Sequence, residues 1–87
     1  MLNLMVLLEI TFELAQQWSK LGAAFIAAVC VFAAAWGISR IGVRALESIA
    51  RQPEAGNDIR SSMIVSAALI EGVTFFAIVV CLLVLFV

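Results

Sequence analysis

Residues 63–87 read MIVSAALIEGVTFFAIVVCLLVLFV, and this run decides the fold. It covers about 25 residues, more than the roughly 20 that a helix needs to cross the hydrocarbon of a bilayer. Glu71 is its only charged residue. A charge at the centre of a bilayer costs about 2.5–3.5 kcal/mol on insertion scales. A carboxylic acid kept in such a place indicates a role in moving an ion or a proton, so Glu71 is the first candidate functional residue.

The composition of the whole chain is typical of a membrane protein. The chain has 87 residues, of which 66% are hydrophobic, and its mean hydropathy is +1.21. A soluble domain of this size buries only about 60% of its unfolded surface and could not hide so much apolar area. A second uncharged run, residues 21–38, covers about 18 residues. Because backbone groups in lipid must be hydrogen-bonded within their own segment, both runs are predicted to be helices.

We therefore expect an all-α membrane protein, a hairpin of two transmembrane helices forming one domain over residues 1–87. The expected elements are a first helix at about 5–50 with its span near 21–38, a polar loop at 51–57, and a second helix at 58–86. Pro53 disfavours helix at the residue before it and ends the first helix. Asn57 or Asp58 is expected to cap the second helix.

The basic residues predict the orientation. Arg40, Arg44, Arg51 and Arg60 lie between the spans, so the positive-inside rule places the loop in the cytoplasm and both termini on the outer side. We expect a bacterial inner membrane. Residues 1–20 lack the basic start of a signal peptide and carry two glutamates, so we interpret them as the outer end of the first helix.

The first span is rich in small residues with small-xxx-small spacing, in the pairs Ala23/Ala27, Ala33/Gly37 and Ala35/Ser39. Close backbone approach holds helices together in lipid. One interpretation is that first helices of several copies pack on each other, with the bulkier second helices outside. The other is a contact within one hairpin. A two-helix unit has little interior for Glu71, which favours self-association into a closed homo-oligomeric ring.

Counting from the centre of the turn places Ile38 opposite Glu71, each about 25 Å from the turn. The expected surroundings of Glu71 are Ala34, Gly37, Ile38, Ala67, Ala68 and Phe75. Cys30 and Cys81 are interpreted as inert packing residues. With no His in the chain, a metal site is poorly supported.

The loop carries Arg51-Gln52-Pro53, the second helix carries Ala68-Leu69-Ile70-Glu71-Gly72, and the first helix carries a stripe of small residues. In these three parts the sequence resembles the rotor-ring proteolipid of F-type ATP synthase, its c subunit. The combination is highly specific and covers nearly the whole chain.

The resemblance implies a non-catalytic subunit in which Glu71 is reversibly protonated while the ring turns against the stator channel, the a subunit. It also implies that Arg51, Gln52 and Pro53 grip the central stalk, which is made of the gamma and epsilon subunits. We expect membrane lipids as partners, no nucleic acid and no cofactor.

Protons are the expected ion. Sodium-using members place a Gln on the first helix and a Ser or Thr after the carboxylate, where this chain has Ile38 and Gly72; Phe76 stands where a Tyr is often found. Sodium needs several oxygen ligands, whereas a proton needs only the carboxylate.

Two other classes stay open on the residues alone. A small ion or drug exchanger could use one membrane carboxylate, although such proteins usually have more spans. A pore-forming hairpin such as a holin would not require Glu71.

Overall fold

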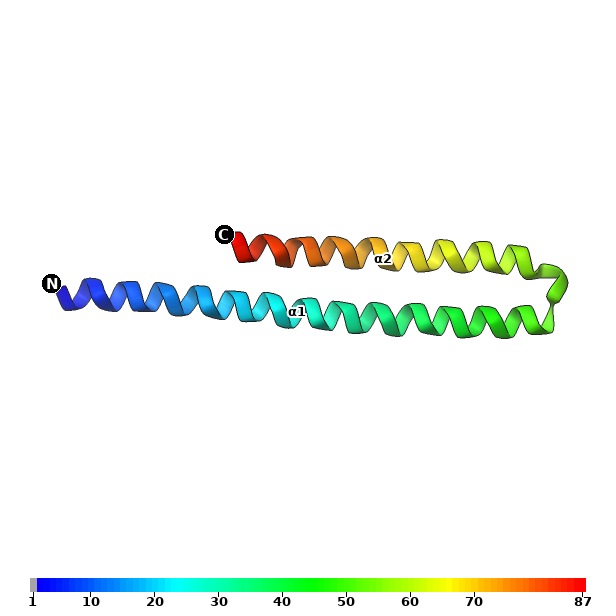
Figure 1. Cartoon of the computed structure of the whole chain (residues 1–87), viewed down its shortest axis with the longest axis horizontal. Helices are drawn as coiled ribbons and strands as arrows, with labels where there is room; N and C mark the ends of the chain where they lie inside the picture. Colours follow the sequence, from blue (N-terminus) through cyan, green and yellow to red (C-terminus); the bar gives the residue numbers. More distant parts are fainter. Residues whose placement is uncertain (1) are drawn as a thin grey trace.

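The computed structural model describes residues 2–87 as two antiparallel helices side by side (Figure 1). Helix α1 (Leu2–Arg51) is joined by a 3₁₀ turn, η1 (Pro53–Ala55), to helix α2 (Gly56–Phe86). The molecule measures 78 × 16 × 8 Å. Met1, the first residue of the expected domain, lies outside the described residues. Since α2 is 31 residues long and α1 is 50, the N-terminal part of α1 extends well past the end of α2 (Figure 1).

The turn is built from backbone hydrogen bonds around one proline. Gln52, which precedes Pro53, has φ −133° and ψ 71°, outside the helical region, because the proline ring crowds the residue before it. The Gln52 N–H still donates to the Ser48 carbonyl at 2.9 Å, and the Ala55 N–H donates to the Gln52 carbonyl at 3.0 Å. The chain therefore reverses within four residues at the end of the hairpin.

The predicted side-chain cap of α2 is wrong. The helix begins at Gly56, its N-cap is Ala55, and no side chain caps it. The reason is that η1 runs directly into α2, so that the Gly56 N–H donates to the Pro53 carbonyl. Asn57 instead accepts a hydrogen bond from Arg60 at 3.4 Å. Asp58 lies in the first turn of α2, where its charge complements the helix dipole.

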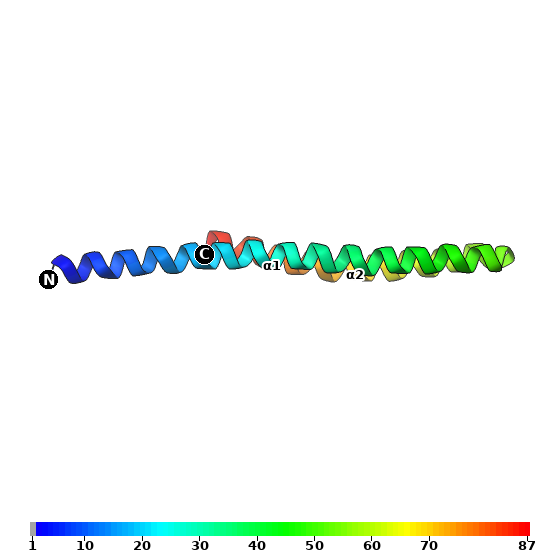
Figure 2. The same cartoon turned by 90° about the horizontal axis from the view of Figure 1, so that it is seen from below.

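The seam between the two helices is narrow. Among residues 3–87 only Ala23 and Ala45 are buried, at 7% and 8% exposure. Half-buried residues recur at intervals of three and four along both helices, which is the spacing of helices that cross at about 20°. The α1 side of the seam is built mainly of small residues from Ala23 to Gly37. Gly37 lies against Ile70, Ala34 lies near Thr74, and Ala23 lies near Ala77 and Cys81. In Figure 2, where α1 lies in front, the C-terminal end of α2 shows above α1 and the middle of α2 shows below it. The two helices therefore cross at a small angle rather than running exactly parallel.

The seam places two of the small residues of α1 against α2. A side-chain carbon added at Gly37 would lie 3.4 Å from Ile70 Cδ1 of the same chain, and Ala23 is buried at the seam. Both therefore lie at the contact between α1 and α2, which is the second of the two interpretations of the small residues. Ala33, Ala35 and Ser39 are exposed and remain free to meet another molecule.

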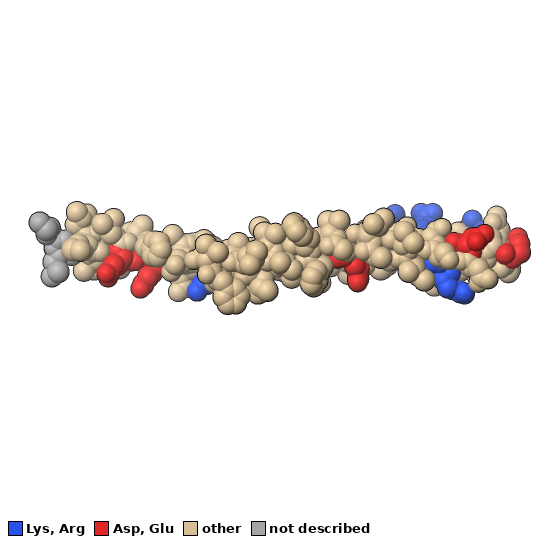
Figure 3. Space-filling view, turned by 90° about the horizontal axis from the view of Figure 1, so that it is seen from above, with Lys and Arg blue, Asp and Glu red and all other residues tan. Residues whose placement is uncertain are grey.

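Nearly all large apolar side chains point outward, among them Phe25, Phe32, Phe75 and Phe76 at 69–72% exposure. Two helices, Asn3–Arg51 and Pro53–Phe86, are long and apolar enough to cross a membrane. Charged side chains gather toward the two ends of the molecule, and one acidic patch interrupts the apolar middle (Figure 3). An apolar middle with charged ends is the pattern of a hairpin that spans lipid.

Candidate functional site: a lone carboxyl group on one flank

Glu71 lies on the side of α2 just beyond the seam, and its side chain is exposed. Two shallow hollows border it, one toward the turn and one toward the C-terminal end, and both lie on the same flank of the hairpin. We call this side the Glu71 flank. The seam residue Ile70 directly precedes Glu71, and the packing of Ile70 on Gly37 fixes how far Glu71 is rotated away from α1.

The hollow nearer the turn has a volume of about 340 Å³. Besides Glu71, it is lined by Ile38, Gly42, Met63, Ile64, Ala67 and Ala68. Every side chain in that set other than Glu71 is apolar, so the hollow offers the carboxyl group no hydrogen-bond partner. Ile38, Ala67 and Ala68 were expected here from the sequence, whereas Gly42, Met63 and Ile64 were not.

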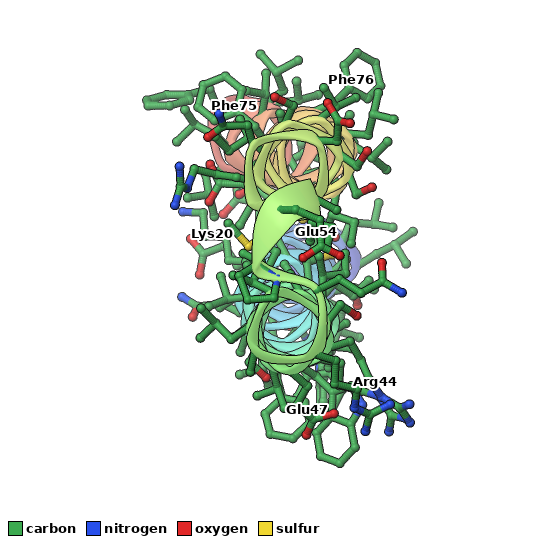
Figure 4. The ribbon with its side chains drawn as sticks, turned by 90° about the vertical axis from the view of Figure 1, so that its right-hand side faces the viewer. Lys20, Arg44, Glu47, Glu54, Phe75 and Phe76 are labelled. Atoms are coloured by element: carbon green, nitrogen blue, oxygen red, sulfur yellow. The ribbon has the colours of Figure 1, made fainter. Side chains whose placement is uncertain are left out.

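The second hollow, of about 290 Å³, lies toward the C-terminal end and is lined by Ala34, Glu71, Thr74, Phe75 and Ile78. Thr74 carries the only hydroxyl there, and it donates to the Ile70 carbonyl of its own helix at 2.8 Å. That bond occupies the hydroxyl proton. Phe75 also extends outward from α2, away from α1, as Figure 4 shows for both Phe75 and Phe76.

Gly37 borders neither hollow, because it faces Ile70 on the seam. Some of the unexpected lining residues could have been found from helical spacing: Ile64 and Ile78 lie seven residues before and after Glu71, which is about two turns. Counting across the turn provides the level of Ile38 but not the rotation of α1, and this rotation decides that Ile38 and Gly42 border the site while Gly37 does not.

Charge around the site is confined to Glu71 itself. No basic residue lines either hollow. Arg44 and Glu47 project from α1 on the side away from α2 (Figure 4). Among residues 2–87 no group of three or more His, Cys, Asp or Glu side chains could hold a metal ion. Within one chain the site is therefore a single carboxyl group among apolar side chains.

The opposite flank of the hairpin differs in character. Ser62 and Val80 lie nine residues before and after Glu71, which places them about 180° around α2 from it. A hollow of about 340 Å³ there is lined in part by Ser48, Asp58, Ser62 and Ser66. We call this side the Ser62 flank. Its serines were not among the expected site residues, although their spacing of four residues on α2 marks one helix face.

The loop residues Arg51, Gln52 and Pro53 lie at the tip of the hairpin, and all three are exposed. Glu71 lies 15 residues beyond the start of α2, about 22 Å from the turn. The structure thus separates the two sets of candidate residues, the carboxyl group in the apolar middle and the polar tip. Cys30 and Cys81 are both free and half-buried.

Comparisons with known proteins agree on one family. The sequence model of the ATP synthase C subunit family matches residues 21–84. The chain is 62% identical over 68 residues to the ATP synthase c subunit of Bacteroides thetaiotaomicron, covering 78% of this chain and 80% of that protein. It is 61% identical over 67 residues to the ATP synthase c subunit of Phocaeicola vulgatus, covering 77% and 80%. The ATP synthase c subunit of Latilactobacillus sakei is 42% identical over 66 residues, covering 76% and 94%. No solved structure matches.

Proposed function

This chain belongs to the ATP synthase C subunit family, and from that premise we propose that it is a proton-carrying subunit of the rotor ring. It is a membrane subunit of an ATP synthase. The observation that carries the finer proposal is the position of Glu71: one exposed carboxyl group, bordered by apolar hollows, on a hairpin whose middle is otherwise uncharged.

The physics of such a group gives the mechanism. In lipid the carboxyl group is held in its neutral form, since a charge there costs about 2.5–3.5 kcal/mol. At an aqueous opening beside a fixed cation of the stator channel it can ionise. A neutral Glu71 can pass along the lipid-facing arc of the ring and an ionised one cannot. Entry of protons from one side and exit to the other then biases rotation, and each proton that crosses 100 mV supplies about 2.3 kcal/mol.

The two unlike flanks support a closed ring. Identical hairpins placed side by side bring the Glu71 flank of one copy against the Ser62 flank of the next. Such a head-to-tail contact generates a ring when the rotation closes. The bulky side chains Phe75 and Phe76 point away from α1 (Figure 4), which suits α2 to the outer, lipid-facing side. The exposed Ala24, Ala28 and Ala35 of α1 allow neighbouring first helices to approach closely.

We favour protons over sodium as the transported ion. Sodium requires several oxygen ligands in place of its water shell, whereas the side chains around Glu71 are Ile38, Ala67, Ala68 and others without oxygen. The single nearby hydroxyl, that of Thr74, bonds to its own helix. A carboxyl group alone is sufficient for a proton.

The exposed tip, Arg51, Gln52 and Pro53, is the part we assign to contact with the central stalk. It lies at the end of the hairpin that bears all four arginines, so the positive-inside rule puts this tip in the cytoplasm and the termini outside. Rotation driven at Glu71 would reach the stalk through this tip.

The test is Glu71→Gln in the assembled ATP synthase, with Glu9→Gln as the matched control in the same helix hairpin. Glu71→Gln should leave the ring intact and abolish both proton flow and proton-driven ATP synthesis, because the amide cannot ionise. Glu9→Gln should retain both. Proton-driven synthesis by Glu71→Gln would rule out the proposed role. Substrate exchange by chains that never form a ring would favour a small exchanger instead.

A further inference from the structure

Two residues of opposite charge, Asp58 and Arg60, lie near the start of α2, and both are exposed. Residues two apart on a helix do not face each other. Their positions differ by about 200° around the helix and by about 3 Å along it. The two side chains therefore lie on nearly opposite sides of α2 at nearly the same height. This is the end of the molecule where acidic and basic side chains gather (Figure 3).

Asp58 belongs to the Ser62 flank. It lines the hollow of about 340 Å³ on that side, together with Ser48, Ser62 and Ser66. The other side chains of this hollow are apolar: Ile41, Ala45, Ile59 and Met63. The hollow therefore contains a carboxylate and three hydroxyl groups but no basic group, on the side where a neighbouring copy would pack.

Arg60 belongs to the Glu71 flank. It lies 11 residues before Glu71, which is about three turns of the same helix. Its guanidinium group donates to the Asn57 side-chain oxygen at 3.4 Å, longer than the usual range of about 2.7–3.2 Å. This weak bond uses one of the five N–H donors of the guanidinium group. Arg60 therefore keeps donors for a carboxylate outside its own helix.

The proposed ring brings these two residues together. The Glu71 flank of one copy meets the Ser62 flank of the next, and all copies stand at the same height. Arg60 of one copy then lies beside Asp58 of the next, offset by about 3 Å along the helix axis. With α2 on the outer side, neighbouring α2 helices are farther apart than neighbouring α1 helices. The long side chain of arginine suits this wider gap and pairs well with a carboxylate.

We propose that Arg60 of each copy forms an ion pair with Asp58 of the next copy, so that a belt of ion pairs surrounds the cytoplasmic end of the ring. The occupant of this part of the Ser62 flank is a second copy of this chain, and the argument for it is the opposite charge of the two flanks at one height. Complementary charges fix the register of a contact, so the belt would align the tips of neighbouring hairpins. This inference rests on the proposed ring.

The test is zero-length cross-linking in the whole ATP synthase in mild detergent. Lys20 is the only lysine of the chain, so Lys20→Arg/Arg60→Lys leaves one side-chain amine, at position 60. A water-soluble carbodiimide should join this amine to the Asp58 carboxyl group of the next copy as an amide. The expected product is a ladder of multimers of the chain. Adding Asp58→Asn should abolish the ladder, and a ladder that survives Asp58→Asn would overturn the proposal.

The matched control is Lys20→Arg/Ser61→Lys, which moves the amine by one residue. Position 61 lies about 100° around α2 from position 60. It also lies three residues after Asp58, where two side chains of one helix meet. The amine should therefore couple to Asp58 within one chain and give no ladder. A ladder as strong as that from Arg60→Lys would overturn the proposal, because no particular flank would then face the next copy.

Native mass spectrometry separates the ion pair from the ring. If Lys20→Arg/Arg60→Lys chains assemble as a closed ring and the carbodiimide gives no ladder, the ion pair is overturned and the ring stands. If the wild-type chain forms no ring, both are overturned.

Charge exchange tests the pair without a cross-linker. Asp58→Lys and Arg60→Glu should each lower the fraction of ring that survives heating, by about two- to fivefold per contact as for an exposed ion pair. Each change places two like charges together. The double variant Asp58→Lys/Arg60→Glu restores an opposite pair and should recover most of the loss. A double variant no more stable than the weaker single variant would overturn the proposal.

Discussion

Gly37 is the position at which the seam can be tested most directly. A carbon added there would lie 3.4 Å from Ile70 Cδ1, the near limit of ordinary contact. Gly37→Ala should therefore be tolerated, because removing a helix glycine gains about 0.5–1 kcal/mol and the end of Ile70 can shift slightly. Gly37→Leu adds three further carbons toward Ile70. Overpacking of that kind costs about 1–3 kcal/mol, or roughly 5- to 150-fold in helix association at 1.4 kcal/mol per tenfold.

The assay is the fraction of assembled ring that survives heating in mild detergent, measured for Gly37→Ala, Gly37→Leu, Ile70→Ala and the double variant Gly37→Leu/Ile70→Ala. The double variant should recover part of the loss, because Ile70→Ala frees the space that the leucine needs. If the two substitutions acted independently, their interaction free energy would be below about 0.5 kcal/mol. That result would refute the packing of Gly37 on Ile70 and return Gly37 to a contact between neighbouring first helices.

The remaining predictions concern the site and the tip. A hydrophobic carbodiimide should modify Glu71, since such reagents attack protonated carboxyl groups, and sodium at neutral pH should give no protection. Protection by sodium would mean that other copies supply oxygen ligands. Thr74→Val should keep proton-driven ATP synthesis within about twofold, because the hydroxyl serves only its own helix; a large loss would make Thr74 part of the ion site. Arg51→Ala should lower ATP synthesis while proton flow persists, and Glu47→Gln should not, because an exposed pair of these residues is worth only about 0.3–0.5 kcal/mol. If Arg51→Ala and Glu47→Gln lowered ATP synthesis equally while proton flow persisted, the stalk contact assigned to Arg51 would be wrong.

The parts of the fold that sequence could predict are those set by chain length and by single residues. Hydropathy predicted two spanning helices, and Pro53 predicted the place where the first helix ends. The start of α2 could not be predicted in the same way. Asn57 and Asp58 are good capping residues, but the backbone bonds of the 3₁₀ turn complete the helix start at Ala55 and Gly56, and these depend on the path of the turn.

The candidate site was likewise only partly predictable from the sequence. The apolar run identifies Glu71 because one acid there is so costly, and the level of Ile38 follows from counting across the turn. Which face α1 turns toward α2 depends on how small and large side chains fit along the whole seam. For that reason Gly37 was expected beside Glu71 and lies instead against Ile70, while Gly42 and Met63 border the site.

The near absence of buried residues has a consequence for how the protein is made. Because only Ala23 and Ala45 are buried within residues 3–87, one hairpin has almost no core, and its form is held by lipid on the outside and by a thin seam within. In the proposed ring much of the remaining apolar flank is covered only when copies meet, so finished rings depend on chain concentration by mass action. Because each ring consumes many copies, a modest fall in the supply of chains lowers the number of rings more than proportionally. The supply of this one subunit, relative to the other subunits, would then set how many complete complexes a cell can hold.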